Sequence, residues 1–317
     1  MAVFDNKNPT ALARRLHADL SLPPMAVPAA GGTPDTLAEL FRAAVLSDQV
    51  IKGFDLLRAV SDLRPRFTCA ADFGPLPDGV RLADGPQEPV LIGISTPMAT
   101  GGPHQHARLA AAFRGKRPMI TLTNPGFTAG EPLPHSTDAV IDYLAEAVLR
   151  AAADRPFVLI GYSSGGTLAH ATAGHLERVR GVGPAGVVLM DTYRVDLEDR
   201  DQGRLMEQLT IGLVRKDEAF GLFHSSALSA MNRYFDLVPR FTLEPLAAPV
   251  LFVGATESFM PPGTATDGDD DWRAKPWDPA HHYIAVRASH FSMIEERAAE
   301  AGALVEEWIS RHARRGD

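Results

Sequence analysis

The stretch Phe157-Val158-Leu159-Ile160-Gly161-Tyr162-Ser163-Ser164-Gly165-Gly166-Thr167-Leu168-Ala169-His170 decides the fold of this chain. A short apolar run ends in Gly-x-Ser-x-Gly and continues directly into a segment compatible with a helix. This arrangement is typical of a nucleophile elbow, in which a serine lies on a tight strand-to-helix turn with its hydroxyl exposed. The N-terminus of the following helix favours a developing oxyanion. Ser163 is therefore the predicted nucleophile.

The bulk composition narrows the class of protein. The chain has 317 residues, of which 45% are hydrophobic and 22% charged, as in ordinary globular proteins. A net charge of -8 argues against a nucleic-acid partner, and the single cysteine, Cys69, excludes an internal disulfide. No apolar run approaches the ~20 residues that span a bilayer, and the polar start of the chain lacks a signal-peptide core. We expect a cytoplasmic protein that uses neither membrane nor nucleic acid.

The first 65 residues differ in character from the rest of the chain. Residues 4–20 predict a short helix with leucines at i+4 spacing, which has no local surface to bury against. Residues 21–35 are rich in proline and glycine and have the composition of a linker. Residues 36–65 predict a hairpin of two amphipathic helices. The hairpin can pack on the domain that follows or bind a second copy, and the residues alone leave both open.

After Pro65, short apolar runs alternate with helical segments. Runs such as 187–190 and 250–253 are apolar throughout, which indicates burial on both faces of a parallel sheet. The alternation predicts an α/β architecture with helices on both sides of the sheet. The predicted strands are 66–71, 80–83, 89–95, 118–123, 156–161, 186–191, 249–254 and 282–288, and the predicted helices are 103–114, 137–153, 165–180 and 294–313.

One insertion interrupts this alternation. Residues 195–245 contain helical stretches but no strand pattern, and they follow the sixth strand of the predicted sheet. An insertion there lies over the carboxyl ends of the strands, where ligands bind in such sheets. We interpret it as a lid. Tyr234, within the insertion, fits a wall of the substrate site and the core of the lid equally well.

A serine nucleophile needs a histidine base, which in turn needs an orienting carboxylate. Among 11 histidines, His290 follows the last predicted strand and precedes the terminal helix, which is where this class of hydrolase carries its base. Phe291 would shield it from water. The next best candidates are His104 and His106, after the third strand. Four further histidines are expected on the surface or in packing, namely His170, His175, His281 and His282.

Two carboxylates occupy suitable positions for the orienting acid. Asp191 ends the sixth strand, and Glu257 follows the seventh, which is the commoner place in this fold. Position alone does not separate them.

Several motifs together resemble the thioesterase domains that end modular type I polyketide synthases. Their order and spacing between residues 89 and 313 carry the resemblance, since each motif alone is weak. The matching pieces are Gly102-Pro103-His104, Arg108-Leu109-Ala110, Pro125-Gly126-Phe127, Glu131-Pro132-Leu133-Pro134, Gly161 to Gly166, Gly186 to Tyr193 and Ser289-His290-Phe291-Ser292-Met293.

The resemblance implies an α/β-hydrolase fold and favours Asp191 as the acid. It also implies that residues 36–65 dimerise and that Tyr193 lines a substrate channel under the lid. Residues 1–20, with Phe4-Asp5 and Pro9 to Ala13, look like the last helix of an acyl carrier protein. The implied partners are therefore an upstream carrier domain, a second copy of the chain and a polyketide acyl substrate.

Some residues depart from the pattern of the resembling family. Tyr162 stands where many relatives have histidine, and Thr96-Pro97-Met98 replaces Gly-Thr-Ala. Because proline has no N–H to donate, we expect the oxyanion hole to use the N–H groups of Ser164 and Met98. The predicted substrate contacts are Tyr193, Tyr162, Tyr234 and Phe291.

The resulting prediction is a chain-releasing serine thioesterase with the triad Ser163, Asp191 and His290. It would release a carrier-bound acyl chain by hydrolysis or by macrolactonisation. The residues imply no metal and no cofactor, since the phosphopantetheine arm belongs to the carrier. The alternatives are a free-standing esterase or lipase of the same fold, and a non-catalytic α/β-hydrolase scaffold.

Overall fold

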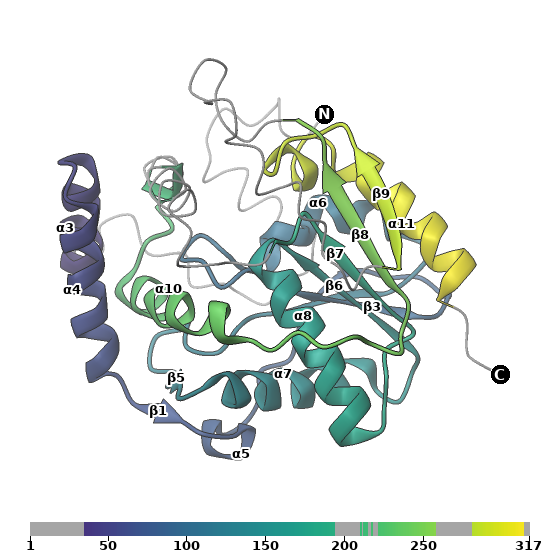
Figure 1. Cartoon of the computed structure of the whole chain (residues 1–317), viewed down its shortest axis with the longest axis horizontal. Coiled ribbons are helices and arrows are strands. Elements are labelled where there is room, and N and C mark those ends of the chain that lie inside the picture. The colour runs from purple at the N-terminus through teal and green to yellow at the C-terminus, as the bar shows by residue number, and fades with distance from the viewer. Residues whose placement is uncertain are drawn as a thin grey trace.

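A seven-stranded, mostly parallel sheet forms the centre of the molecule (Figure 1). The computed structural model describes residues 35–193, 210, 212–214, 217, 221–257 and 281–313. Six strands are parallel, and β2 pairs with β4 in the antiparallel direction at one edge. In spatial order the strands are β2 (Val80–Ala83), β4 (Met119–Leu122), β3 (Val90–Ile94), β6 (Phe157–Tyr162), β7 (Gly186–Met190), β8 (Val250–Ala255) and β9 (His282–Val286). The predicted α/β-hydrolase architecture is confirmed.

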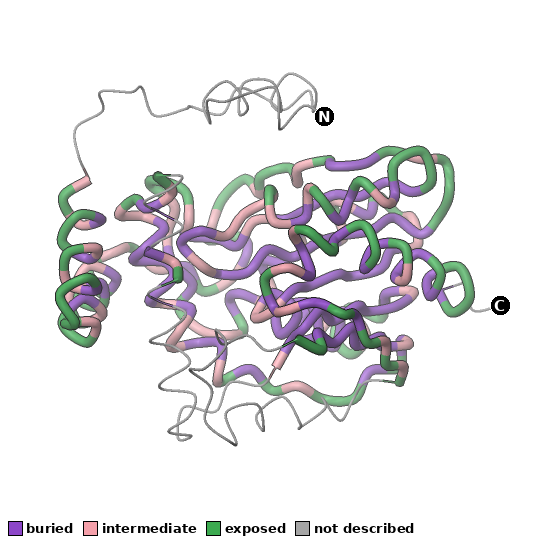
Figure 2. The backbone as a smooth tube through the Cα atoms, turned by 90° about the horizontal axis from the view of Figure 1, so that it is seen from above, coloured by how far each residue is buried: buried purple, intermediate pink, exposed green. Residues whose placement is uncertain are grey.

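Helices cover both faces of this sheet because its central strands are apolar on both sides. On β6, Phe157 and Leu159 belong to the hydrophobic cluster beneath α7 (Thr137–Ala152) and α8 (Ser164–His175). Val158 and Ile160 alternate with them and belong to the cluster on the opposite face. That second cluster is closed by α6 (Ala107–Ala110) and α11 (Ala298–His312). Figure 2 shows buried backbone running through the interior of the molecule, with exposed residues around the outside.

Two helices at one end of the molecule form a separate layer with part of the insertion. α3 (Thr36–Leu46) and α4 (Val50–Leu63) pack against α10 (Ser225–Leu237) around a third apolar cluster that includes Phe41 and Leu57. The carboxylate of Asp35 joins two of these helices, because it accepts hydrogen bonds from the N–H of Ala38 in α3 and from that of Ser225 in α10. The N-terminal hairpin is thereby fixed to the insertion.

The predicted strand at 66–71 is wrong. Only Arg66–Phe67 is extended, as β1, and it pairs with β5 (Leu133–Pro134) outside the main sheet. The short helix α5 (Ala70–Phe73) follows. The side chain of Asp72 accepts hydrogen bonds from the backbone N–H and hydroxyl of Thr68, and these local bonds compete with a strand ladder.

Other elements lie where they were predicted, with adjusted boundaries. The helix predicted at 103–114 is divided into η1 (Pro103–His106), α6 and η2 (Ala111–Phe113). α8 continues as a π-helical turn, η3 (Leu176–Arg180), and short turns follow α10 at η4 (Val238–Arg240) and precede α11 at η6 (Ser292–Ile294).

Some predictions lie outside the described residues. They are the carrier-like helix at 4–20, the linker apart from its last residue, and the first part of the insertion, 195–209. Within the part of the chain that the structure describes, no helix has both the length and the apolar character that crossing a membrane requires.

Candidate active site

Ser163 lies on the turn between the end of β6 and the start of α8. Its backbone has φ 53° and ψ -134°, a conformation that L-residues rarely adopt and that stores strain. The turn is fixed by hydrogen bonds from the N–H of Ser163 to the carbonyl of Met190 (2.9 Å) and from the N–H of Gly166 to the carbonyl of Ser163 (2.9 Å). The side chain is half-buried, so the predicted elbow presents its hydroxyl at the carboxyl edge of the sheet.

The elbow depends on glycines because α8 starts very close to the sheet. A Cβ atom on Gly161 would overlap the backbone of Gly165 and Gly166, and one on Gly165 would lie 2.6 Å from the carbonyl oxygen of Ile94. A Cβ on Gly166 would overlap the side chain of Thr192. Gly166 therefore leaves room for Thr192, in the segment that follows β7. The Gly-x-Ser-x-Gly motif alone did not indicate this requirement.

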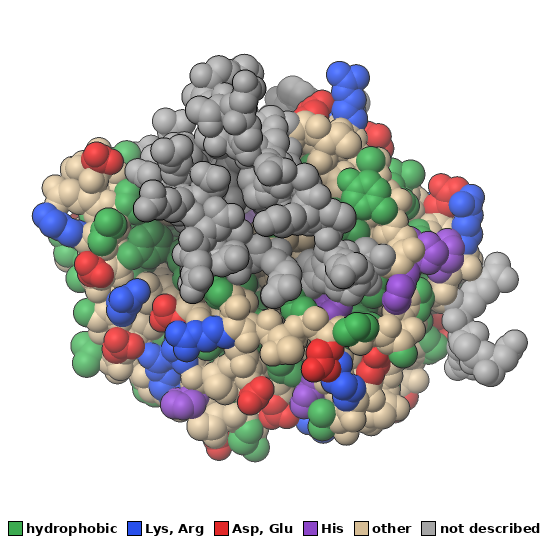
Figure 3. Space-filling model, viewed as in Figure 1, with side chains coloured by type: hydrophobic (Ala, Val, Ile, Leu, Met, Phe, Trp, Pro, Cys, Tyr) green, Lys and Arg blue, Asp and Glu red, His purple; other side chains and the backbone are tan. Residues whose placement is uncertain are grey.

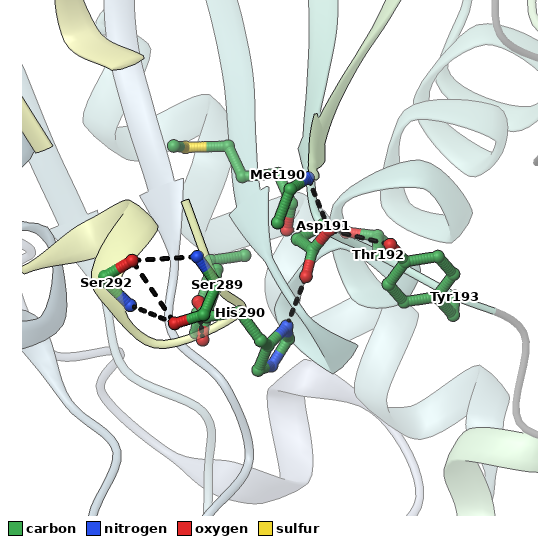
Figure 4. Close-up of polar contacts among 9 residues, drawn as sticks. Met190, Asp191, Thr192, Tyr193, Ser289, His290 and Ser292 are labelled. Carbon is green, nitrogen blue, oxygen red and sulfur yellow. Dashed lines mark hydrogen bonds and ion pairs between the residues drawn. The ribbon is translucent and has the colours of Figure 1, made fainter. Parts of the chain in front are cut away.

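Asp191 and His290 are brought together from separate loops at the same edge (Figure 4). Asp191 follows β7 with a positive φ of 44°, and His290 lies between β9 and α11. The Oδ2 of Asp191 and the Nδ1 of His290 are 2.6 Å apart, and both side chains are buried. This is the geometry in which a carboxylate fixes an imidazole with Nδ1 protonated, leaving Nε2 to act as a base.

The second oxygen of Asp191 is also occupied. Oδ1 accepts a hydrogen bond from the hydroxyl of Tyr193 (2.7 Å) and one from the backbone N–H of Ala255 (2.9 Å). Burial alone would raise the pKa of Asp191, but the hydrogen bonds from His290, Ala255 and Tyr193 together lower it below its ordinary value. The carboxylate therefore stays ionised at neutral pH.

Glu257, the other candidate acid, lies elsewhere. It is exposed at the end of β8, and its carboxylate pairs with the guanidinium of Arg287 at 3.3 Å. The carboxylate that contacts His290 is that of Asp191.

The alternative histidines occupy other environments. His104 is exposed and contacts the carbonyl of Thr100 (3.1 Å) through Nε2. His106 is buried beside Gly93 and Thr121, and burial lowers its pKa to about 4. Burial likewise lowers the pKa of His170, inside α8, to about 4. His281 accepts a hydrogen bond from the N–H of Val250, at the amino end of β8 and far along the strand from Ser163.

The loop after β3 is organised by Gln105. Its Oε1 accepts a hydrogen bond from the N–H of Thr96 (3.0 Å), and its Nε2 donates to the hydroxyl of the same residue (2.5 Å). Since the N–H of Thr96 is occupied and Pro97 has none, Met98 is the next residue of this loop that can donate. Ser164 opens α8, so its N–H has no carbonyl partner within the helix. No sequence pattern indicated this role of Gln105, because its hydrogen-bond partners depend on the conformation of the loop.

The four predicted substrate contacts divide into two groups. Tyr162 and Tyr234 are buried, and their hydroxyls donate to the carbonyls of His290 (2.7 Å) and Pro125 (3.3 Å), so a role in substrate contact finds no support in these bonds. Tyr193 is half-buried, and its hydroxyl holds Asp191. Phe291 is 46% exposed, and its ring lies edge-on to that of His290 with centroids 5.5 Å apart.

Comparison with known proteins places the chain in a family. Residues 94–309 match the family model described as "Thioesterase domain". The chain is 37% identical over 281 residues to the polyketide synthase GfsE of Streptomyces halstedii, covering 87% of the chain and 7% of that protein. It is 34% identical over 283 residues to the erythronolide synthase EryA3 of Saccharopolyspora erythraea, covering 88% and 8%. The chain thus spans less than a tenth of the length of these two relatives.

Solved structures agree on the fold. The Vlm2 thioesterase domain with a bound dodecadepsipeptide superposes with a TM-score of 0.54 at 18% identity, covering 75% of this chain and 98% of that one. YbtT, a type II thioesterase of the yersiniabactin pathway, gives 0.51 at 21% identity, covering 74% and 98%. The chain belongs to the thioesterase domain family and is similar in sequence to the thioesterase regions of modular type I polyketide synthases.

Proposed function

We propose that this thioesterase releases a polyketide acyl chain from a carrier protein, with Ser163 as nucleophile, His290 as base and Asp191 as orienting acid. The observation that carries the proposal is the 2.6 Å contact between the Asp191 and His290 side chains, at the edge of the sheet where the strained elbow presents Ser163. The polyketide synthases GfsE and EryA3 support the choice of substrate class.

In the first half-reaction, the Oγ of Ser163 attacks the carbonyl carbon of the thioester and transfers its proton to Nε2 of His290. Nδ1 cannot take this proton, because it is hydrogen-bonded to Asp191. The ionised carboxylate stabilises the imidazolium that forms. The oxyanion accepts hydrogen bonds from the N–H groups of Ser164 and Met98. Collapse of the tetrahedral intermediate breaks the carbon–sulfur bond, and the imidazolium protonates the departing thiolate of the phosphopantetheine arm.

In the second half-reaction, Nε2 of His290 removes a proton from the second nucleophile as that nucleophile attacks the acyl-serine ester. Water gives a free acid, and a hydroxyl of the acyl chain itself gives a macrolactone. Both routes return the proton to Ser163 and use the same three side chains. The choice between them depends on which hydroxyl reaches the carbonyl first.

Two further parts of the chain belong to the proposed reaction, one that delivers the acyl chain and one that covers the site. The acyl chain arrives on an upstream carrier domain, and residues 1–20 form the last helix of that domain. Residues 21–35 are the linker that joins it to the thioesterase domain. The insertion at 195–245 acts as the lid. Both assignments rest on sequence pattern, since residues 1–34 and the first part of the insertion, 195–209, lie outside the described residues.

We further propose that α3 and α4 form a homodimer interface. One side of the hairpin is buried against α10 through residues such as Phe41 and Leu57. Other apolar side chains of the same two helices are exposed: Leu40 52%, Leu46 61%, Ile51 78% and Leu63 87%. Hydrophobic side chains are seen among the charged ones at this end of the molecule in Figure 3. Burying such side chains against a second copy removes their apolar surface from water.

The chemical class of substrate is tested by comparing two matched esters. A long ω-hydroxyacyl N-acetylcysteamine thioester and the corresponding oxygen ester share the acyl group and differ in the leaving atom. We expect a larger kcat/KM for the thioester, and mass spectrometry of the products distinguishes acid from macrolactone by the mass of one water. Faster turnover of the oxygen ester would instead indicate a free-standing esterase.

A further inference from the structure

Tyr162 contacts the predicted base in two ways. Its hydroxyl donates a hydrogen bond to the main-chain carbonyl of His290 at 2.7 Å. Its ring is stacked on the imidazole of His290, with centroids 4.8 Å apart and an interplanar angle of 29°. Two independent contacts from one side chain therefore define both where the backbone of His290 lies and which way its ring faces.

The position of Tyr162 in the chain explains why this matters. It is the last residue of β6, and Ser163 follows it directly. In β6 it is paired with Met190, which immediately precedes Asp191. Tyr162 is thus bonded to the strand pair that carries the nucleophile and the acid, while its side chain reaches the loop that carries the base. Tyr162 therefore contacts all three segments that carry the predicted triad.

Several hydrogen bonds of the His290 loop lie within the loop. The N–H of Ser289 donates to the hydroxyl of Ser292 (2.8 Å), the N–H of Ser292 donates to the hydroxyl of Ser289 (3.2 Å), and the N–H of Met293 donates to the carbonyl of Ser289 (3.1 Å). These bonds give the loop its shape but do not connect it to the elbow. The N–H of Glu257, at the end of β8, donates to the carbonyl of Ala288 (2.8 Å) and ties the start of the loop to the sheet. At His290 itself, the side chains of Asp191 and Tyr162 provide bonds to the ends of β7 and β6.

Burial makes these contacts persistent. Tyr162 is 5% exposed and His290 8%, so water competes little for the hydrogen bond between them. Tyr162 also belongs to the apolar cluster that contains Ala288, Met293 and Ile294, which lie on either side of His290 in the chain. A tyrosine here offers a flat ring for stacking and a hydroxyl at the right reach. Phenylalanine offers the ring alone, and leucine neither.

We infer that Tyr162 is a positioning residue that holds the His290 imidazole in the orientation from which it deprotonates Ser163, and that it acts through His290 rather than by contacting substrate. This inference rests on the proposed function, because it takes His290 as the base. It accounts for a large polar side chain in a buried position next to the nucleophile. Its consequence is that substitutions change the chemical step and leave substrate binding alone.

The test compares Tyr162→Phe and Tyr162→Leu with wild type in the full chain. With an acyl N-acetylcysteamine thioester we expect kcat to fall about tenfold in Tyr162→Phe and roughly a hundredfold in Tyr162→Leu, because small displacements of a catalytic group are costly. KM should stay close to the wild-type value. Tyr143→Phe is the matched control, since Tyr143 is a buried tyrosine of the other hydrophobic cluster and should leave kcat unchanged.

A second readout needs no substrate. The proton shared between Nδ1 of His290 and Asp191 gives a downfield NMR signal, which is assigned by its absence in His290→Gln. We expect faster exchange of this proton with water in Tyr162→Phe and loss of the signal in Tyr162→Leu. If wild type shows the signal but does not turn over thioesters, the proposed function fails while this readout still tests the positioning role.

Three outcomes would overturn the inference. In the first, kcat and the downfield signal are both unchanged in the two Tyr162 variants. In the second, KM rises enough to account for the loss of activity, which would make Tyr162 a substrate contact. In the third, Tyr143→Phe loses as much kcat as Tyr162→Phe, which would indicate a general effect of removing a buried hydroxyl. Circular dichroism melts of each variant identify loss of folding, and the conservative Tyr162→Phe keeps the test valid if Tyr162→Leu unfolds.

Discussion

At the scale of single residues, the site is defined by which polar groups form hydrogen bonds with one another. Asp191 uses one oxygen for His290 and the other for Tyr193 and Ala255, and these hydrogen bonds outweigh the effect of burial and lower the pKa of its carboxyl group. Position along the chain placed Asp191 and Glu257 at equivalent strand ends, and the family resemblance favoured Asp191. The structure shows that the carboxylate of Asp191 is the one in contact with His290. The partner of Tyr162 was equally beyond sequence reasoning, because it lies 128 positions further along the chain.

The assignment of the acid gives a direct comparison of two isosteric substitutions. Asp191→Asn should lower kcat for an acyl thioester by roughly 10³ to 10⁴, since an amide no longer stabilises the imidazolium and favours the wrong tautomer. Glu257→Gln should leave kcat within about threefold of wild type, because an exposed ion pair with Arg287 contributes little. Steady-state rates of the two purified variants provide the measurement. The reverse ranking would transfer the acid to Glu257.

At the scale of elements, the helices and strands with strong periodicity were predictable and the weakly patterned ones were not. The apolar runs of β6, β7 and β8 and the amphipathic α7 lie where the sequence put them. The strand expected at 66–71 failed, because Asp72 and Thr68 form local bonds and helix-favouring alanines follow. The pairing of β1 with β5 was not predictable, because each strand has only two residues.

The N-terminal hairpin carries a prediction about assembly. Replacing Leu40, Ile51 and Leu63 together by glutamate should convert a dimer into a monomer, because charged groups cannot be buried at the interface without a large cost. Analytical ultracentrifugation measures the change. The matched control replaces Val179 and Val182 by glutamate. These residues are 65% and 44% exposed and lie in or just after η3, outside the hairpin, so the dimer should stay intact. A wild-type chain that sediments as a monomer would refute the interface.

At the scale of the whole molecule, the arrangement follows from one sheet whose carboxyl edge gathers three distant loops. Residues 163, 191 and 290 come from the ends of β6 and β7 and from the loop after β9, and the parallel direction of these strands brings those ends to one side. The sequence predicted this arrangement because each of the three residues follows an apolar run that is typical of a parallel strand. The sequence did not predict the contacts that position these residues, namely those of Gln105, Gly166 and Tyr162. These contacts depend on side-chain packing between elements.

The central claim is that Ser163 forms a covalent acyl-enzyme with a thioester substrate. Intact-protein mass spectrometry after mixing with an N-acetylcysteamine thioester tests it most directly, followed by peptide mapping of the added acyl mass. Cys69→Ser serves as the control, because it removes the only thiol to which the acyl group could transfer. We expect an acyl group on the peptide containing Ser163 in wild type and in Cys69→Ser, and none in a folded Ser163→Ala variant. Undiminished acylation of Ser163→Ala would contradict it.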